Sequence, residues 1–239
     1  VLSNSDFVDI YARALDDPDS NEDTKDLADQ LESAYVGNSD AGKVSAMSGL
    51  WGQAKTSRDR YGMLVLTARA AALIAPTDSY GTEADWLVVS MMTAGLDTSA
   101  VGWASVLGAG STGWGILSVG APGMDGQISY SQLDDFYDND QSEETRKSQF
   151  LLAGLAGLGR IDADTQQEFA ETLEIDLTGD TNWTRAIVAA AERGESGTVA
   201  LLAAAGLQGA GWHKVPARYL YYITRSLQQV GLEAEARMI

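Results

Sequence analysis

Apolar residues recur at intervals of three and four along most of this chain, which is the spacing of one face of an α-helix. Runs that alternate between apolar and polar residues, as in a half-buried β-strand, are scarce. The pattern predicts about ten helices, over ranges that include 5–15, 22–36, 41–54, 58–75 and 82–95. We therefore expect an all-α fold, with antiparallel helical hairpins stacked as an irregular, solenoid-like helical-repeat array or packed as a compact multi-helical domain.

A recurrent ending, in which an apolar helix is followed by a small residue, Gly and Leu, occurs at four places. The copies end at Leu96, Leu158, Leu207 and, more faintly, Leu232. Glycine at a helix end takes the left-handed conformation that costs other residues steric energy, and the leucine folds back on the last turn. The pattern predicts four helix C-termini. The spacing between the copies varies, so a strict solenoid is not established.

We expect residues 1–239 to form a single domain. The best candidate for an internal boundary is the glycine-rich stretch 108–126, which would divide the chain into parts 1–110 and 125–239. This stretch overlaps an uncharged run, 98–124, that is long enough to span a bilayer. Glycine, serine and threonine dilute the run so heavily that a buried, glycine-rich hairpin is the better interpretation, and no membrane-spanning segment is predicted.

The charge and the residue types that are missing exclude several classes of function. Thirty-four acidic residues against sixteen basic ones give a net charge of −18, a field that repels phosphate backbones, so nucleic acid is not an expected partner. The absence of cysteine removes disulfides, thiolate nucleophiles and cysteine-ligated zinc. The single histidine, His213, excludes a multi-histidine metal site, and we expect it to be structural or exposed.

A Gly-x-Gly-x-x-Gly spacing at Gly108, Gly110 and Gly113 is one that can bring backbone amides against a dinucleotide pyrophosphate. The fingerprint should open a helix inside a βαβ unit. Here "VGAPG" breaks the following segment after about six residues, and no second strand is evident nearby. A glycine-rich connection between helices is therefore predicted in place of a nucleotide site.

The segment "GMDGQISYSQLDDFYDND" contains fragments of two cation-binding motifs. The first fragment begins at Asp125 and resembles the second half of an EF-hand calcium loop, but the first and third ligand positions carry no side-chain oxygen. Helix capping explains more of the residues. Ser129 is the predicted N-cap with Gln132 as its capping-box partner, and Ile128 and Leu133 form a hydrophobic staple.

The second fragment, "DDFYD", places Asp134 and Asp138 on one helix face with Asp135 beside them. It is similar to the aspartate-rich motif of class I isoprenoid synthases, all-α enzymes in which magnesium ions at this motif bridge to a substrate diphosphate. The second acidic motif and the basic residues that such a site needs are missing downstream. The three aspartates are candidate ligands for Mg²⁺ or Ca²⁺, and no other cofactor is predicted. The alternative is a solvated acidic corner, in which Asp140 caps the next helix with Glu143 as its partner.

We expect a non-catalytic function, as a bacterial helical interaction or scaffold module that binds another protein through an acidic, helix-lined surface. This expectation depends partly on the absence of a catalytic constellation. Two alternatives stay open: a divalent-cation-dependent enzyme or ligand binder that uses the aspartate cluster, and a structural component of the cell envelope. The absence of cysteine and the first residue, Val1, favour a processed, periplasmic or exported protein over a cytoplasmic one.

Overall fold

A computed structural model describes residues 13, 19, 21–123, 126–209 and 211–239. Within these residues there are thirteen α-helices and three short 3-10 helices, and no β-strand. The predicted all-α fold is therefore confirmed. The helix predicted over 5–15 lies outside the described residues, apart from residue 13.

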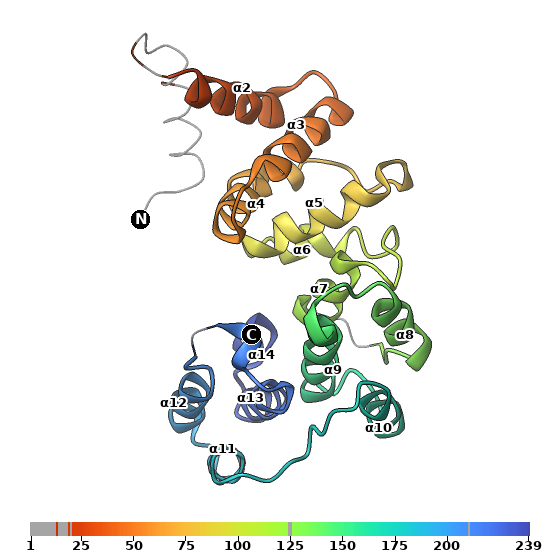
Figure 1. The fold of residues 1–239 in the computed structure, drawn as a ribbon, viewed down its shortest axis with the longest axis vertical. Helices are drawn as coiled ribbons and strands as arrows, with labels where there is room; N and C mark the ends of the chain where they lie inside the picture. The colour runs from red at the N-terminus through yellow and green to blue at the C-terminus, as the bar shows by residue number, and fades with distance from the viewer. Residues whose placement is uncertain (1–12, 14–18, 20, 124–125, 210) are drawn as a thin grey trace. The chain divides into compact units, whose positions relative to one another are not determined.

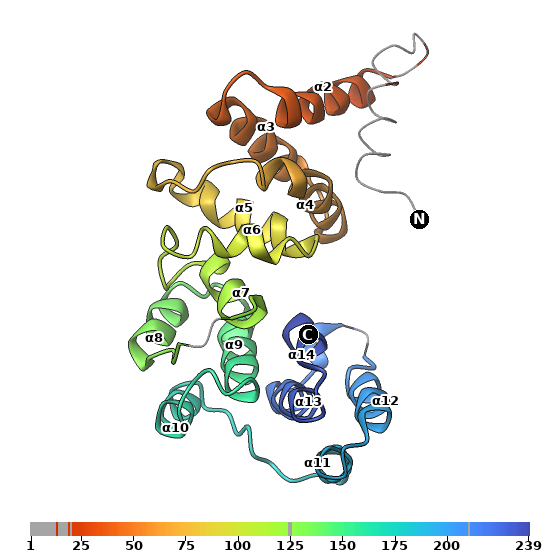
Figure 2. The ribbon, with the colours of Figure 1, turned by 180° about the vertical axis from the view of Figure 1, so that it is seen from behind.

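The chain divides into two compact units, which are described separately. The first comprises residues 1–108 and 112–117, and the second comprises residues 109–111 and 118–239. Figure 1 and Figure 2 show the helices of each unit in chain order, from opposite sides. Whether the two units make up one domain, as the sequence suggests, stays a prediction.

The first unit contains α2 (Glu22–Val36), α3 (Asp40–Gln53), α4 (Ser57–Ala71), η1 (Asp78–Tyr80), α5 (Thr82–Thr93) and α6 (Asp97–Val101). The side chains of Asn21, Ser39 and Thr56 cap α2, α3 and α4, and each accepts a hydrogen bond from the N–H of the third helical residue. Helices that follow one another in the chain pack together, α2 on α3, α3 on α4 and α4 on α5. The predicted succession of helical hairpins is present in this unit.

A buried polar chain joins three helices of the first unit. Nε1 of Trp51 on α3 donates to Oγ1 of Thr67 on α4 at 2.9 Å, and this oxygen lies 3.1 Å from Oγ of Ser90 on α5. The Ser90 hydroxyl donates in turn to the backbone oxygen of Leu64 at 2.6 Å. Because every member has a partner, hydrogen bonds within the protein offset the cost of removing these polar groups from water, and they fix the register of the three helices.

The second unit contains α8 (Tyr130–Asp138), η2 (Glu143–Thr145), α9 (Arg146–Gly157), α10 (Ala163–Thr172), α11 (Asn182–Glu192), α12 (Ser196–Gly206), η3 (Trp212–Lys214), α13 (Ala217–Gln229) and α14 (Glu233–Met238). The helix α7 (Thr112–Gly120) begins in the first unit and ends in the second. Helix α9 packs most extensively against α13, and both views show these two helices side by side. On other sides α9 contacts α8 and α10, while α11, α12 and α13 pack on one another.

Helices end at all four predicted Gly-Leu places, and at two of them the glycine takes the predicted left-handed conformation. Gly95 after α5 and Gly231 after α13 take left-handed φ angles of +71° and +81°. The N–H groups of Leu96 and Leu232 then donate back to the last turns at 2.9 Å each. These are the glycine-terminated helix ends that the sequence predicts.

At the other two places the explanation by left-handed glycine is wrong. Gly157 and Gly206 are the last helical residues of α9 and α12, and each is glycine because another side chain lies where its Cβ would be. A Cβ on Gly157 would overlap Oγ1 of Thr224 on α13, and one on Gly206 would overlap the Trp183 ring. The left-handed residue after α9 is Gly159, with a φ of +67°.

Candidate functional site

The three predicted cation ligands lie on α8, near its C-terminal end. Asp134 is half-buried, whereas Asp135 and Asp138 are exposed. Across the described residues no group of three or more His, Cys, Asp or Glu side chains is placed to hold a metal ion. The assignment of Mg²⁺ or Ca²⁺ to this corner stays a prediction.

The residues before α8 cap that helix, as predicted. The N–H of Ser129 donates to Oε1 of Gln132 at 3.0 Å, which is the return hydrogen bond of a capping box. Ile128 and Leu133 are both buried, as a hydrophobic staple requires. Asp125, the first residue of the calcium-like fragment, lies outside the described residues.

Asp140 anchors the start of α9, but without the predicted partner. Its carboxylate accepts hydrogen bonds from the N–H and hydroxyl of Ser142, at 2.8 and 2.6 Å, and from the N–H and hydroxyl of Ser148, at 2.8 and 2.7 Å. Glu143 is not the box partner, because the two residues after it take left-handed φ angles of 53° and 50° and interrupt the helix. The Asp140 carboxylate therefore caps α9 through Ser148, eight residues further along the chain, instead of through a residue three positions away.

Acidification is expected to remove the stabilisation that Asp140 gives to α9. Burial raises the pKa of the Asp140 carboxyl, but the hydrogen bonds from Ser142 and Ser148 together outweigh burial, so its pKa in the folded state is lowered. Such a group stabilises the fold fully above its unfolded pKa of about 3.9, and the contribution is lost as the pH falls through the folded pKa. We expect Asp140→Asn to lower the free energy of unfolding by about 1–2 kcal/mol at neutral pH, because the carboxylate is only half-buried.

Urea denaturation of the wild-type protein and of Asp140→Asn, at neutral pH and at pH values well below ~4, measures this effect. The difference between the two proteins should shrink as the pH falls through the lowered folded-state pKa of Asp140, below which the wild-type carboxyl is also neutral. An equal difference at both pH values would contradict the assigned role of the charge.

The glycine-rich stretch passes close to the backbone of other segments, and this explains why two of its residues are glycine. The N–H of Gly113 donates to Oδ1 of Asp85 at 2.8 Å, and a Cβ on Gly113 would lie 3.1 Å from the Asp85 Cα. In the second unit, a Cβ on Gly110 would lie 2.8 Å from the backbone oxygen of Asp135. The predicted connection between helices is present, and close backbone packing accounts for Gly110 and Gly113.

An acidic surface lies on α10 and on the segment that follows it. Residues 161–184 include seven acidic residues and no lysine or arginine, and all seven are exposed. Asp164, Glu168 and Glu171 are spaced by four and three residues and share one helix face. We name this the α10 surface, and its carboxylates are Asp162, Asp164, Glu168, Glu171, Glu174 and Asp176. This surface was not among the predicted sites, although the long run without a positive charge is a visible signal in the sequence.

Aromatic packing turns the acidic face of α10 outward. Phe169, on the opposite face, is fully buried and contacts Tyr130 and Tyr137 of α8 edge-on, with ring centroids 5.5 and 6.3 Å away. The Tyr130 hydroxyl lies 3.0 Å from Oγ1 of Thr172 at the end of α10. Burial of Phe169 therefore fixes which residues of α10 face the solvent.

A hollow of about 360 Å³ opens beside this acidic face, between α10 and residues 175–178. Its lining combines the carboxylates of Glu171 and Asp176 with the apolar side chains of Ile175 and Leu177. The chain turns back here because Glu174 takes a left-handed φ of +54°, and the N–H of Ile175 donates to a carbonyl of α10 at 3.0 Å. The hollow thus has a mixed lining, in which apolar side chains lie beside carboxylates.

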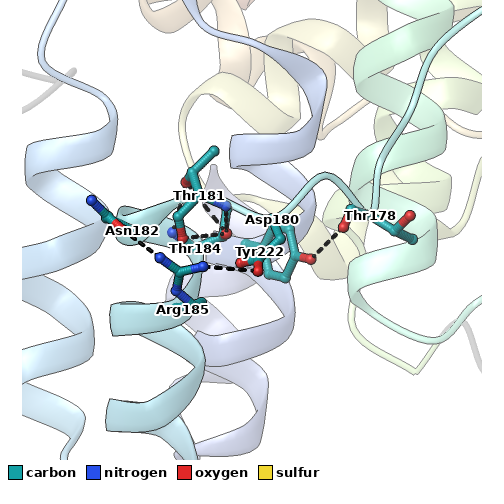
Figure 3. Close-up of polar contacts among 7 residues, drawn as sticks. All are labelled: Thr178, Asp180, Thr181, Asn182, Thr184, Arg185 and Tyr222. Atoms are coloured by element: carbon teal, nitrogen blue, oxygen red, sulfur yellow. Dashed lines mark hydrogen bonds and ion pairs between the residues drawn. The ribbon is translucent and has the colours of Figure 1, made fainter.

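The segment after the hollow is held by local and long-range hydrogen bonds. Oδ1 of Asp176 accepts from the N–H and the hydroxyl of Thr178, at 2.7 and 2.9 Å. These bonds, the backbone one above all, together with the charge of Arg218, lower the pKa of Asp176. The hydroxyl of Tyr222 on α13 donates to the backbone oxygen of Thr178 at 3.2 Å, a contact drawn in Figure 3.

Polar contacts also fix the N-terminus of α11 (Figure 3). Thr181 caps the helix and shares a capping box with Thr184, with hydrogen bonds of 3.1 and 2.8 Å. The guanidinium of Arg185 forms an ion pair with Asp180 at 3.0 Å, and Arg185 also donates to Asn182. The segment from Asp176 to Arg185, whose first residues line the hollow, is therefore held by hydrogen bonds and one ion pair.

Comparisons of the chain with protein-family models, with curated proteins and with solved structures found no match. None of the helices in the described part of the chain has the length and apolar character needed to cross a membrane. His213 lies in η3 and is exposed, which agrees with the prediction. The function is therefore inferred from the geometry of the second unit.

Proposed function

We propose that the protein is a non-catalytic interaction module that binds another protein through the α10 surface. The observation that carries this proposal is the combination of an uninterrupted row of exposed carboxylates with a hollow lined in part by Ile175 and Leu177. In protein interfaces, charges guide the encounter and choose the partner, while a buried apolar anchor supplies most of the affinity.

The charge of the surface determines the chemistry of the partner. At physiological ionic strength, charges act over about 8 Å, so the nearby carboxylates dominate the field that a partner meets. Residues 161–184 contain no lysine or arginine, and among these carboxylates Asp176 is acted on by the charge of Arg218 on α13. The partner we propose is a protein segment that presents lysine or arginine around one or two apolar side chains.

Short synthetic peptides test this proposal. The probe has two leucines flanked on each side by two lysines, and its reference peptide has serines in place of the leucines. We expect the leucine peptide to bind saturably in fluorescence anisotropy, more tightly than the serine peptide, because only leucine can fill the hollow. Neutralising Asp164, Glu168 and Glu171 together, as Asn, Gln and Gln, should weaken binding about tenfold, because each exposed ion pair contributes up to about 1 kcal/mol.

A matched control separates the α10 surface from the overall charge of the protein. Helix α2 also exposes acidic residues, and Asp23→Asn, Asp26→Asn and Asp29→Asn together change the net charge by the same amount. We expect this control to bind the leucine peptide within about twofold of the wild-type protein. Equal losses in the two triple variants, or equal binding of the two peptides, would count against the proposal.

A further inference from the structure

Helix α12 lacks charge on its outer face as well as on its inner face. Its inner face, with Val199 and Ala203 buried, packs against α11 and α13. Two helices in the described part of the chain, α7 and α12, contain no charged residue. Helix α7 exposes only its first residue, whereas seven of the eleven residues of α12 are exposed. A helix that is apolar all round is normally covered on every side, so the outer face of α12 is expected to have a partner.

The outer face of α12 has one large side chain among small ones. Leu201 is 75% exposed, although it lies in the middle of the helix. The residues three and four positions from it share its helix face and are all exposed, namely Gly197, Thr198, Ala204 and Ala205. Small side chains let a second helix approach closely and leave room for a projecting leucine. The face therefore carries both a projection and the recess that fits it.

The charge around α12 allows a second copy of this acidic protein to approach it. Each copy has a net charge of −18, so two copies in general repel each other. Along α12 and the turns on either side, residues 193–214, the only acidic residue is Glu195, and its carboxylate pairs with Arg193 at 2.7 Å. Lys214 adds a positive charge at the far end. Because charges act over about 8 Å at physiological ionic strength, this stretch offers a second copy little repulsion.

We propose that α12 packs on α12 of a second copy of this chain, as an antiparallel helix pair about a two-fold axis. An axis at the level of Ala203 brings the two helices together at their centres. Leu201 of each copy then lies against Ala204 and Ala205 of the other. Such a contact is self-complementary, because each copy supplies both the projection and the recess. The residues of α12 are separate from those of the α10 surface, so a dimer leaves that surface available to a basic partner.

The size of the contact predicts a weak dimer. A helix of eleven residues is about 16 Å long. One pair of such helices buries less than the ~1,200 Å² of a small stable interface, so we expect a dissociation constant of about 10⁻⁴ M. Added salt should strengthen the dimer, because it screens the repulsion between two copies that each carry a charge of −18. Binding of a basic peptide to the α10 surface should instead weaken with salt.

Sedimentation equilibrium of the full chain tests the proposal, from about 10 µM to about 1 mM protein and in about 0.15 M and about 0.5 M NaCl. The weight-average mass should rise with concentration from 25.4 kDa toward twice that value, and further at the higher salt. Leu201→Glu should keep the protein monomeric, because it keeps a good helix former but places a carboxylate from each copy in the contact. Leu73→Glu is the matched control. It makes the same change of charge at a leucine that is 66% exposed outside α12, and it should leave dimerisation unchanged.

Cysteine cross-linking locates the contact, because the chain has no cysteine of its own. In an antiparallel pair centred on Ala203, Thr198 of one copy lies opposite Gln208 of the other. A mixture of Thr198→Cys and Gln208→Cys proteins should therefore form disulfide dimers about fivefold more readily than either protein alone. The proposal is overturned if the mass stays at 25.4 kDa throughout, if Leu201→Glu dimerises as tightly as Leu73→Glu, or if the mixture cross-links no better than the single proteins.

Discussion

Replacing Arg160 with methionine is expected to lower the free energy of unfolding of the second unit by about 3–5 kcal/mol. Arg160 is 9% exposed, and its guanidinium donates to the backbone oxygens of Ser118, Val119 and Ala121, at 2.6, 3.1 and 2.8 Å. These carbonyls lie at the C-terminal end of α7, where a positive charge is favoured by the helix dipole. Methionine would leave the buried carbonyls without donors.

A lysine at position 160 separates the effect of the positive charge from the effect of the planar guanidinium. Arg160→Lys keeps the positive charge but not the planar donors that reach three carbonyls, so we expect a loss of roughly half that of Arg160→Met. Arg193→Met is the matched control, because Arg193 is exposed and its ion pair is with Glu195, which is close to it in the sequence. Urea denaturation followed by circular dichroism measures all three variants. A loss for Arg160→Met no larger than that for Arg193→Met would contradict the capping role.

Gly157→Ala is expected to cost about 3 kcal/mol, although alanine is the better helix former. The new Cβ would lie 2.9 Å from the Cβ of Thr224 and 3.0 Å from the backbone oxygen of Tyr221, at the contact between α9 and α13. Thr224 is buried, and its hydroxyl is held by the backbone oxygen of Leu220 at 2.8 Å. Relief therefore requires the two helices to separate.

Two further variants test this explanation by denaturation. Gly197→Ala on α12 adds a Cβ with no atom within 4 Å, and it should leave stability unchanged or raise it by up to about 1 kcal/mol. Thr224→Ala combined with Gly157→Ala should cost less than the sum of the two single changes, because the alanine at position 224 removes the atom that is overlapped. Additive losses, or equal effects of Gly157→Ala and Gly197→Ala, would show that the helices do not approach this closely.

The helices could be predicted from the sequence because local signals specify them. The predicted range 22–36 coincides with α2, which has Asn21 as its cap and Gly37 after it. The range 58–75 extends beyond α4, because the chain leaves the helix in tight turns at residues 72–74, before it reaches Pro76. Local patterns are weakest at such helix ends, where a few hydrogen bonds decide the boundary.

The sites were less predictable because they depend on contacts between distant residues. The predicted cation site was chosen for the spacing of Asp134, Asp135 and Asp138, which is a local property. The hollow beside α10 exists because Glu174 takes a left-handed conformation, which a glutamate does not signal. The role of Gly157 likewise depends on which helix crosses it, and that is not encoded in the neighbouring residues.

The most direct test of the proposed function is to map where the lysine–leucine peptide binds, by amide chemical shifts in an NMR titration. The account predicts saturable shifts concentrated at residues 163–178, with the largest changes at Ile175 and Leu177, and no comparable changes on α2. Shifts spread over α2 and α10 in proportion to their acidic residues, or absent at Ile175 and Leu177, would contradict the claim that the α10 surface is the binding face.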